Sequence, residues 1–75
     1  METIELNIDQ TQRVRDIALA LEGAKEWQDE TLIAWFEEQY DTVVDVVSLE
    51  LGKSHLSRPQ VTIQPTKVIF TYGRI

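Results

Sequence analysis

The sequence predicts an α+β fold, in the order β-α-α-β-β, with two helices packed on one face of a three-stranded sheet. Three observations lead to this prediction. Apolar and polar residues alternate near both ends of the chain, apolar residues recur at helical spacing in two segments between them, and capping or turn-forming residues separate these segments. With 75 residues the chain has the size of one domain, so residues 1–75 are expected to form a single unit.

The first strand is predicted at residues 3–8, because apolar and polar side chains alternate strictly there. Asp9 is predicted to cap the helix that follows, with a glutamine three residues later in a capping-box arrangement. This helix is expected to cover residues 10–21 and to stop at Gly23, since glycine is common just past a helix end. Trp27, in the connection, is expected to pack before the next helix begins.

The second helix is predicted to be the longest element of the chain. Asp29 or Thr31 is expected to cap it, and Gly52 to end it. Its apolar residues recur at three- and four-residue spacing without interruption. The β-branched run at residues 42–47 leaves a strand open as an alternative there, but the unbroken spacing favours a helix.

The C-terminal part is predicted to be a loop at residues 53–59 followed by a β-hairpin. Its strands are expected at residues 60–64 and 67–72, on either side of the turn-forming pair Pro65 and Thr66. The core is expected to contain the apolar side of every element, namely Ile4, Leu6, Ile8, Val14, Ile17, Leu21, Leu32, Phe36, Tyr40, Val43, Val47, Val61, Ile63, Val68 and Phe70.

The charge is distributed unevenly along the chain. Residues 1–51 contain all 13 acidic residues and three of the seven basic ones, whereas residues 52–75 contain the other four basic residues and no acid. One interpretation is that a basic C-terminal ribbon lies against an acidic helical layer. The other is that the two surfaces face different partners.

The sequence offers little for catalysis or for metal binding. It contains no cysteine and one histidine, His55, which lies in a predicted loop with no carboxylate close in sequence. Its paired carboxylates lie on a helix face that we expect to be open to water, where nothing separates their pKa values. We therefore expect a non-enzymatic protein without a metal or a cofactor, and the catalytic and metal site lists stay empty. Without a signal peptide or a spanning apolar run, a cytoplasmic protein with no membrane partner is expected.

One face of the second helix is strongly acidic and contains no intervening Lys or Arg. We predict that this face binds a basic surface of a partner protein, and that the protein is a small regulator, adaptor or inhibitor. The alternative is a surface that only keeps the protein soluble. The predicted partner-binding residues are Glu30, Glu37, Glu38, Asp41 and Asp45.

The apolar arc of the second helix is broader than one neighbouring layer needs. Trp35, Val46 and Leu49 widen this arc on one flank. They are either part of the core or an oligomer interface, and we predict a homodimer through them. A different chain of a larger assembly is the remaining alternative for covering this flank.

A strand, a helix, a short connection and a second helix between Thr3 and Val47 resemble the element order of ribbon–helix–helix DNA-binding proteins. The resemblance implies that outward residues of the strand enter the major groove, where Glu5 would be repelled by phosphate. A net charge of −6 also lacks the basic footprint of a DNA-binding domain. Nucleic-acid binding through the basic C-terminal hairpin stays open as an alternative function, with phosphate contacts from Lys53, Arg58, Lys67 and Arg74.

Overall fold

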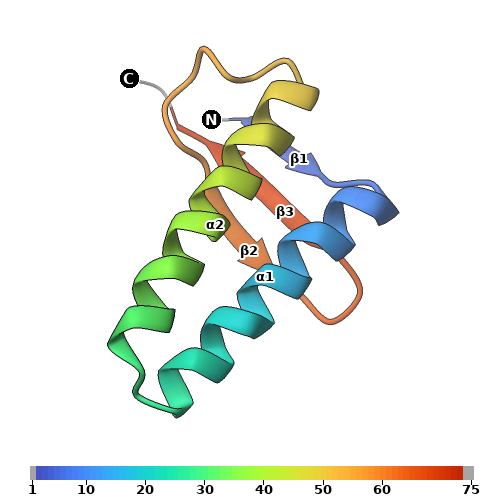
Figure 1. The fold of residues 1–75 in the computed structure, drawn as a ribbon. Helices are drawn as coiled ribbons and strands as arrows, with labels where there is room; N and C mark the ends of the chain where they lie inside the picture. Colours follow the sequence, from blue (N-terminus) through green and yellow to red (C-terminus); the bar gives the residue numbers. More distant parts are fainter. Residues whose placement is uncertain (1, 74–75) are drawn as a thin grey trace.

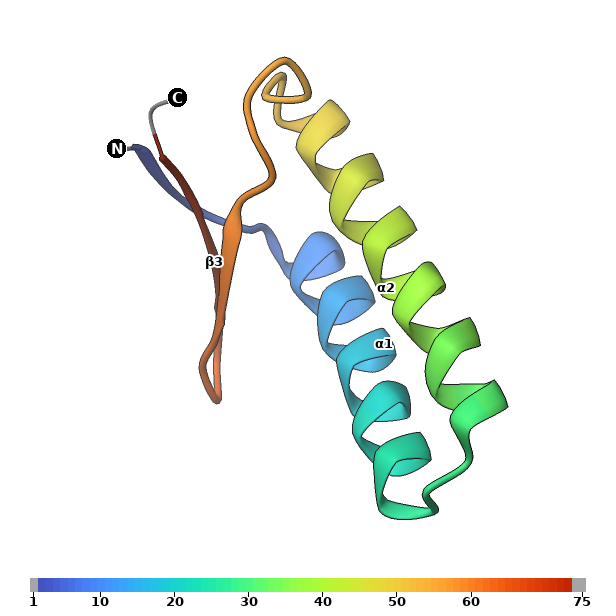
Figure 2. The same cartoon turned by 90° about the vertical axis from the view of Figure 1, so that its left-hand side faces the viewer.

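The fold is a three-stranded antiparallel sheet with both helices on one of its faces (Figures 1 and 2). It was obtained as a computed structural model, which describes residues 2–73. The elements follow the predicted order, so the predicted fold class is confirmed. They are β1 (Glu2–Glu5), α1 (Ile8–Glu26), α2 (Glu30–Glu50), β2 (Gln60–Ile63) and β3 (Val68–Tyr72).

Strand β3 lies in the middle of the sheet, between β1 and β2. Both neighbours are antiparallel to it, and Phe70 is opposite Ile4 on one side and Val61 on the other. Val68, Phe70 and Tyr72 are fully buried, whereas the two residues between them are half-buried. The predicted alternation of the last strand is therefore confirmed, because the helical layer covers only one face of β3.

Helix α1 begins two residues earlier than predicted, and the prediction that Asp9 caps it was wrong. Asn7 is the cap: its side chain accepts a hydrogen bond from the backbone N–H of Gln10 at 2.8 Å. The Gln10 side chain in turn accepts one from the backbone N–H of Asn7 at 3.2 Å, which completes a capping box. Ile8 is consequently the first helical residue and is 88% exposed, although the alternation had placed it in a buried strand position.

The end of α1 was also predicted too early, because the helix continues through Gly23 to Glu26. It ends in a Schellman arrangement in which the backbone N–H of Gln28 bonds to Lys25 and that of Asp29 to Ala24. Gln28 takes the left-handed conformation, with φ of 56°, that the prediction had reserved for a glycine. Trp27 does not pack before α2 as expected but is 84% exposed.

Helix α2 follows the prediction closely. Asp29 caps it by accepting a hydrogen bond from the backbone N–H of Leu32 at 3.1 Å. The helix runs unbroken through the β-branched segment, so residues 42–47 are helical and not a strand. Gly52 ends it in the left-handed conformation with φ of 72°, which a residue with a side chain adopts only with strain.

The core lies between β3 and the two helices and is smaller than predicted. Ile8, Leu32 and Ile63 are exposed, while Val44 and Tyr72, which the prediction left out, are fully buried. Figure 2 shows that the helical layer and the sheet diverge towards the α1–α2 connection and the β2–β3 turn, so Ile63, the last residue of β2, borders a hollow and is not covered by the helices. The buried apolar residues are Leu6, Val14, Ala24, Val44, Val47, Val68, Phe70 and Tyr72.

At the other end of the helical hairpin, polar contacts join α2 to the sheet and to α1. The buried hydroxyls of Ser48 and Tyr72 form a hydrogen bond of 2.7 Å between α2 and β3. The Glu50 carboxylate accepts hydrogen bonds from Gln10 at 3.1 Å and from Arg13 at 2.6 Å, which ties the start of α1 to the end of α2. These hydrogen bonds, from Arg13 first and then from Gln10, lower the pKa of Glu50 from its ordinary value of 4.5.

The lowered pKa of Glu50 predicts a dependence of stability on pH. A carboxylate whose pKa falls on folding stabilises the protein fully above its unfolded pKa and loses this contribution as pH falls through the folded value. We therefore expect wild type to be more stable than Glu50→Gln near pH 7, and the difference to shrink towards about pH 3. Urea unfolding across this range measures the difference. Glu22→Gln, which removes an exposed carboxylate of α1, measures the effect of charge alone, and a Glu50→Gln difference constant over the range would contradict the assignment.

Candidate functional site: the outer face of α2

The face of α2 that points away from the core carries a stripe of large apolar side chains. Trp35 and Leu49 are 53% and 65% exposed, and Leu32 and Val46 are exposed as well. They lie on one side because three- and four-residue steps repeat the same helix face. The three residues predicted to form an oligomer interface, Trp35, Val46 and Leu49, thus share an exposed face and are not part of the core.

Of the acidic residues that were predicted to bind a partner, Glu38 and Asp45 lie beside this stripe, whereas Glu30 and Glu37 lie at seven-residue steps before the buried Val44 and hence on another side of the helix. All five are exposed, but the structure divides them into two groups. Asp41 and Asp45 lie 3.1 and 3.8 Å from the guanidinium of Arg58, which comes from the loop before β2. Within residues 2–73, the other three have no ion-pair partner; they are Glu30, Glu37 and Glu38.

The basic residues of the C-terminal segment lie next to acids of the N-terminal part. Lys53 bonds to Glu2 at 3.1 Å, and Lys67 lies 3.7 Å from Glu5, so both contact β1, while Arg58 contacts α2. Arg74, the fourth predicted phosphate contact, lies outside the described residues. A phosphate that approached Lys53, Arg58 or Lys67 would meet a carboxylate beside each of them, which opposes the nucleic-acid alternative.

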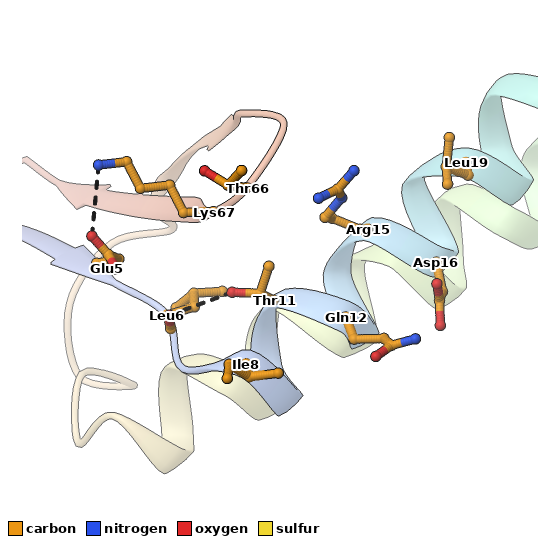
Figure 3. A pocket seen from close by; sticks show the side chains of 10 residues that line it. All are labelled: Glu5, Leu6, Ile8, Thr11, Gln12, Arg15, Asp16, Leu19, Thr66 and Lys67. Carbon is orange, nitrogen blue, oxygen red and sulfur yellow. Dashed lines mark hydrogen bonds and ion pairs between the residues drawn. The ribbon is translucent and has the colours of Figure 1, made fainter.

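A hollow of about 420 Å³ lies between the start of α1, the end of β1 and the β2–β3 turn (Figure 3). The Glu5–Lys67 ion pair lies at one side, and exposed Ile8 and Leu19 lie along α1. The Thr11 hydroxyl in this hollow donates a hydrogen bond to the Leu6 carbonyl oxygen at 3.4 Å. The hydroxyl thus bonds to a backbone carbonyl oxygen, which cannot activate it as a general base would. We interpret the hollow as a depression of the surface.

A second hollow, of about 430 Å³, lies where the helical layer diverges from the sheet. It is lined by α1, by Tyr40 of α2 and by Ile63 of β2. Burial raises the pKa of the Tyr40 hydroxyl, and the nearby Arg58 partly offsets this effect. The lining is mostly apolar and includes Leu19 and Leu21, which is consistent with incomplete packing between the two layers.

His55 lies exposed in the loop that follows α2. Within the part of the chain that the structure describes, no three His, Asp or Glu side chains are arranged to hold a metal ion. In the same residues, neither helix is long and apolar enough to cross a bilayer.

Comparisons of the chain with protein-family models, with curated proteins and with solved structures found no match. The outer face of α2 combines the most exposed apolar side chains of that helix with the adjacent carboxylate of Glu38, which has no ion-pair partner within residues 2–73, and it is the strongest candidate for a binding surface.

Proposed function

We propose that this protein is a small non-enzymatic interaction module that binds a basic partner protein with the outer face of α2. One observation carries the proposal: Trp35 and Leu49 are more than half exposed on the same helix that presents Glu37 and Glu38 without a cation. Tryptophan and charged side chains around an apolar centre are typical of protein interfaces. A cytoplasmic location fits a chain without cysteine, and is part of the proposal.

The two parts of this surface would have different roles. Covering a large apolar side chain supplies affinity, on the order of 25 cal/mol for each Å² of apolar surface removed from water. The acidic residues would attract a basic partner over about 10 Å at ordinary ionic strength, which raises the association rate and makes it sensitive to salt. A regulator, an adaptor or an inhibitor could each use such a surface, because each of these proteins binds a partner without catalysing a reaction.

Reversal of Glu37 and Glu38 tests the acidic part of this proposal. Neither carboxylate has a cation partner among residues 2–73, so Glu37→Lys/Glu38→Lys breaks no ion pair there and should leave the fold intact. We expect it to weaken capture of the partner about tenfold at low salt and less at high salt. The measurement is crosslinking in cells of the source organism, identification of captured proteins by mass spectrometry, and titration of each purified protein.

The matched control is Glu22→Lys/Glu26→Lys, which changes the net charge equally on α1, away from the outer face of α2. A basic protein that this control retains and the α2 reversal loses would support the proposal. If both variants capture the same proteins with equal affinity, the acidic face of α2 is ordinary surface and the proposal is wrong.

The predicted homodimer would use the same apolar stripe, since Trp35, Val46 and Leu49 are all exposed on it. A second copy would however bring a second acidic row against the first, which is unfavourable at low salt. A basic partner has the complementary charge, and for this reason we favour it over a second copy as the occupant of this face.

A further inference from the structure

We infer that the partner presents a basic amphipathic helix, which packs lengthwise along α2 in the manner of a two-stranded coiled coil. The inference rests on the proposed function and names the structural element that the outer face of α2 would recognise. It comes from the spacing of the exposed residues on α2 and from the charge on one side of them.

The exposed stripe of α2 has the repeat of a coiled-coil seam. Its members are separated alternately by three and four residues from one end of the helix to the other, and this seam consists of Leu32, Trp35, Gln39, Thr42, Val46 and Leu49. Such a 3–4 repeat keeps one line of side chains towards a partner helix along its whole length. The core-facing residues Val44 and Val47 lie outside the seam, so a partner helix could cover it without disturbing the core.

The two ends of the seam are apolar, and its middle is polar. Leu32 and Trp35 lie in the first half, Val46 and Leu49 in the second, and Gln39 with Thr42 between them. A polar pair at the centre of a seam sets the register of the partner helix, because only one alignment pairs it with polar groups. Apolar ends with a polar centre thus favour a specific partner helix over unspecific apolar contact.

The charge beside the seam indicates what kind of helix fits. Glu38 and Asp45 each precede a seam residue by one position, which is where coiled coils carry the charges that select a partner. Helix α2 has no Lys or Arg, and Arg58 of the following loop is shared by Asp41 and Asp45. With Glu38 unpaired within residues 2–73, this side of the seam stays net acidic. A partner helix with lysine or arginine at its flanking positions would therefore be complementary along this side of the seam.

A second copy would fit the apolar ends but not the charges. In an antiparallel pair, Leu32 would lie against Leu49 of the second copy and Trp35 against Val46, which is an apolar match. The same alignment brings Glu38 near Asp45 of the second copy, and the symmetry repeats this contact. This juxtaposition of carboxylates leads us to assign the seam to a basic helix of a different protein.

A designed peptide of about 18 residues, the length of the seam, tests the inference directly. It carries leucine at the four outer seam positions, glutamine at the two central ones, lysine at flanking positions and alanine elsewhere, and a companion peptide carries glutamate in place of lysine. The protein is used as Trp27→Phe, so that Trp35 is its only tryptophan; Trp27 is 84% exposed, and its replacement leaves the core unchanged. We expect the lysine peptide to shift the emission of Trp35 to shorter wavelength and the glutamate peptide to leave it unchanged.

Two variants and one control sharpen the result. Leu49→Asp should weaken binding of the lysine peptide at least about tenfold, since it places a charge in the seam. Leu19→Asp is the matched control, because Leu19 is 66% exposed and Leu49 is 65% exposed, but Leu19 lies on α1. Glu38→Lys/Asp45→Lys should lose the lysine peptide and gain the glutamate peptide, a reversal that unspecific apolar binding would not produce.

Light scattering of the wild-type protein separates the remaining outcomes. A dimer at low salt that Leu49→Asp converts to a monomer would overturn the inference and assign the seam to a second copy. Equal peptide binding by Leu49→Asp and Leu19→Asp, or no binding by the wild type, would also overturn it. If partner capture depends on Glu37 and Glu38 but not on Leu49, the proposed function stands and only the partner helix is wrong.

Discussion

Val44→Asp is expected to unfold the domain, whereas Val46→Asp, only two residues further along α2, is expected to leave it folded. Val44 is 1% exposed and packs in the core, while Val46 is 42% exposed on the outer face. A carboxylate at Val44 has no cation within the core and either stays charged at a high cost or takes up a proton. A domain of this size has only about 5 kcal/mol of total stability to lose.

The pair also tests whether this segment is a helix in solution. In a strand, Val44 and Val46 would point to the same face and both substitutions would have similar effects. In a helix they point to nearly opposite sides. Far-ultraviolet circular dichroism and urea unfolding of the two variants measure the outcome. Equal loss of structure in both, or in neither, would contradict the position of α2 in this fold.

Phe70→Ala is expected to have the second large effect, a loss of about 3–5 kcal/mol in the free energy of unfolding. Phe70 is fully buried at the centre of β3 and contacts the Tyr72 ring edge-on at a centroid distance of 6.3 Å. Its replacement leaves a cavity where the sheet meets both helices. Such a loss is comparable to the whole stability of a small domain, so the variant should be largely unfolded at room temperature.

Ile69→Ala is the control for this substitution. Ile69 is the neighbour of Phe70 on the same strand, but it points to the face of the sheet that the helices do not cover and is half-buried. We expect a loss of about 1 kcal/mol for Ile69→Ala, from partial burial alone. Urea midpoints compared at equal m-value give the loss in free energy of unfolding for each variant. A larger loss for Ile69→Ala than for Phe70→Ala would mean that the sheet buries its other face.

The parts of the fold that the sequence predicts are those with a long and regular pattern. The alternation from Val68 to Tyr72 identifies β3, and the repeated three- and four-residue spacing identifies α2 in spite of its β-branched residues. Asp29, one of the two predicted caps, is the cap of α2, and the predicted stop at Gly52 was also correct. In each of these cases local chemistry and the tertiary packing favour the same structure.

The predictions that were wrong concern positions where two local patterns compete, or where burial depends on a layer that is distant in sequence. Asn7 with Gln10 and Asp9 with Gln12 are both capping-box patterns, shifted by two residues, and the start of α1 depends on which one forms. Ile63 is apolar at a suitable position, yet it is exposed because the layers diverge beside the β2–β3 turn. The angle between the layers is a property of the packed structure and leaves no local pattern.

The candidate site follows the same rule. The acidic face and the flank of Trp35, Val46 and Leu49 were visible in the sequence because α2 is regular. The ion pairs of Asp41 and Asp45 with Arg58 were not, since the path of the loop that carries Arg58 leaves no local pattern in the sequence. The division of the acids into paired and unpaired residues therefore required the structure.

The central place of β3 has a consequence for the order in which the chain acquires its structure. Ile4 of β1 pairs with Phe70 of β3. Strand β1 can therefore pair only when nearly all of the described chain has left the ribosome. The helical hairpin of α1 and α2 joins two helices that follow each other directly in the chain and can form first, within about microseconds. Until β3 arrives, the core side of this hairpin is uncovered, and this is the stage of synthesis at which we expect the chain to be most prone to aggregation.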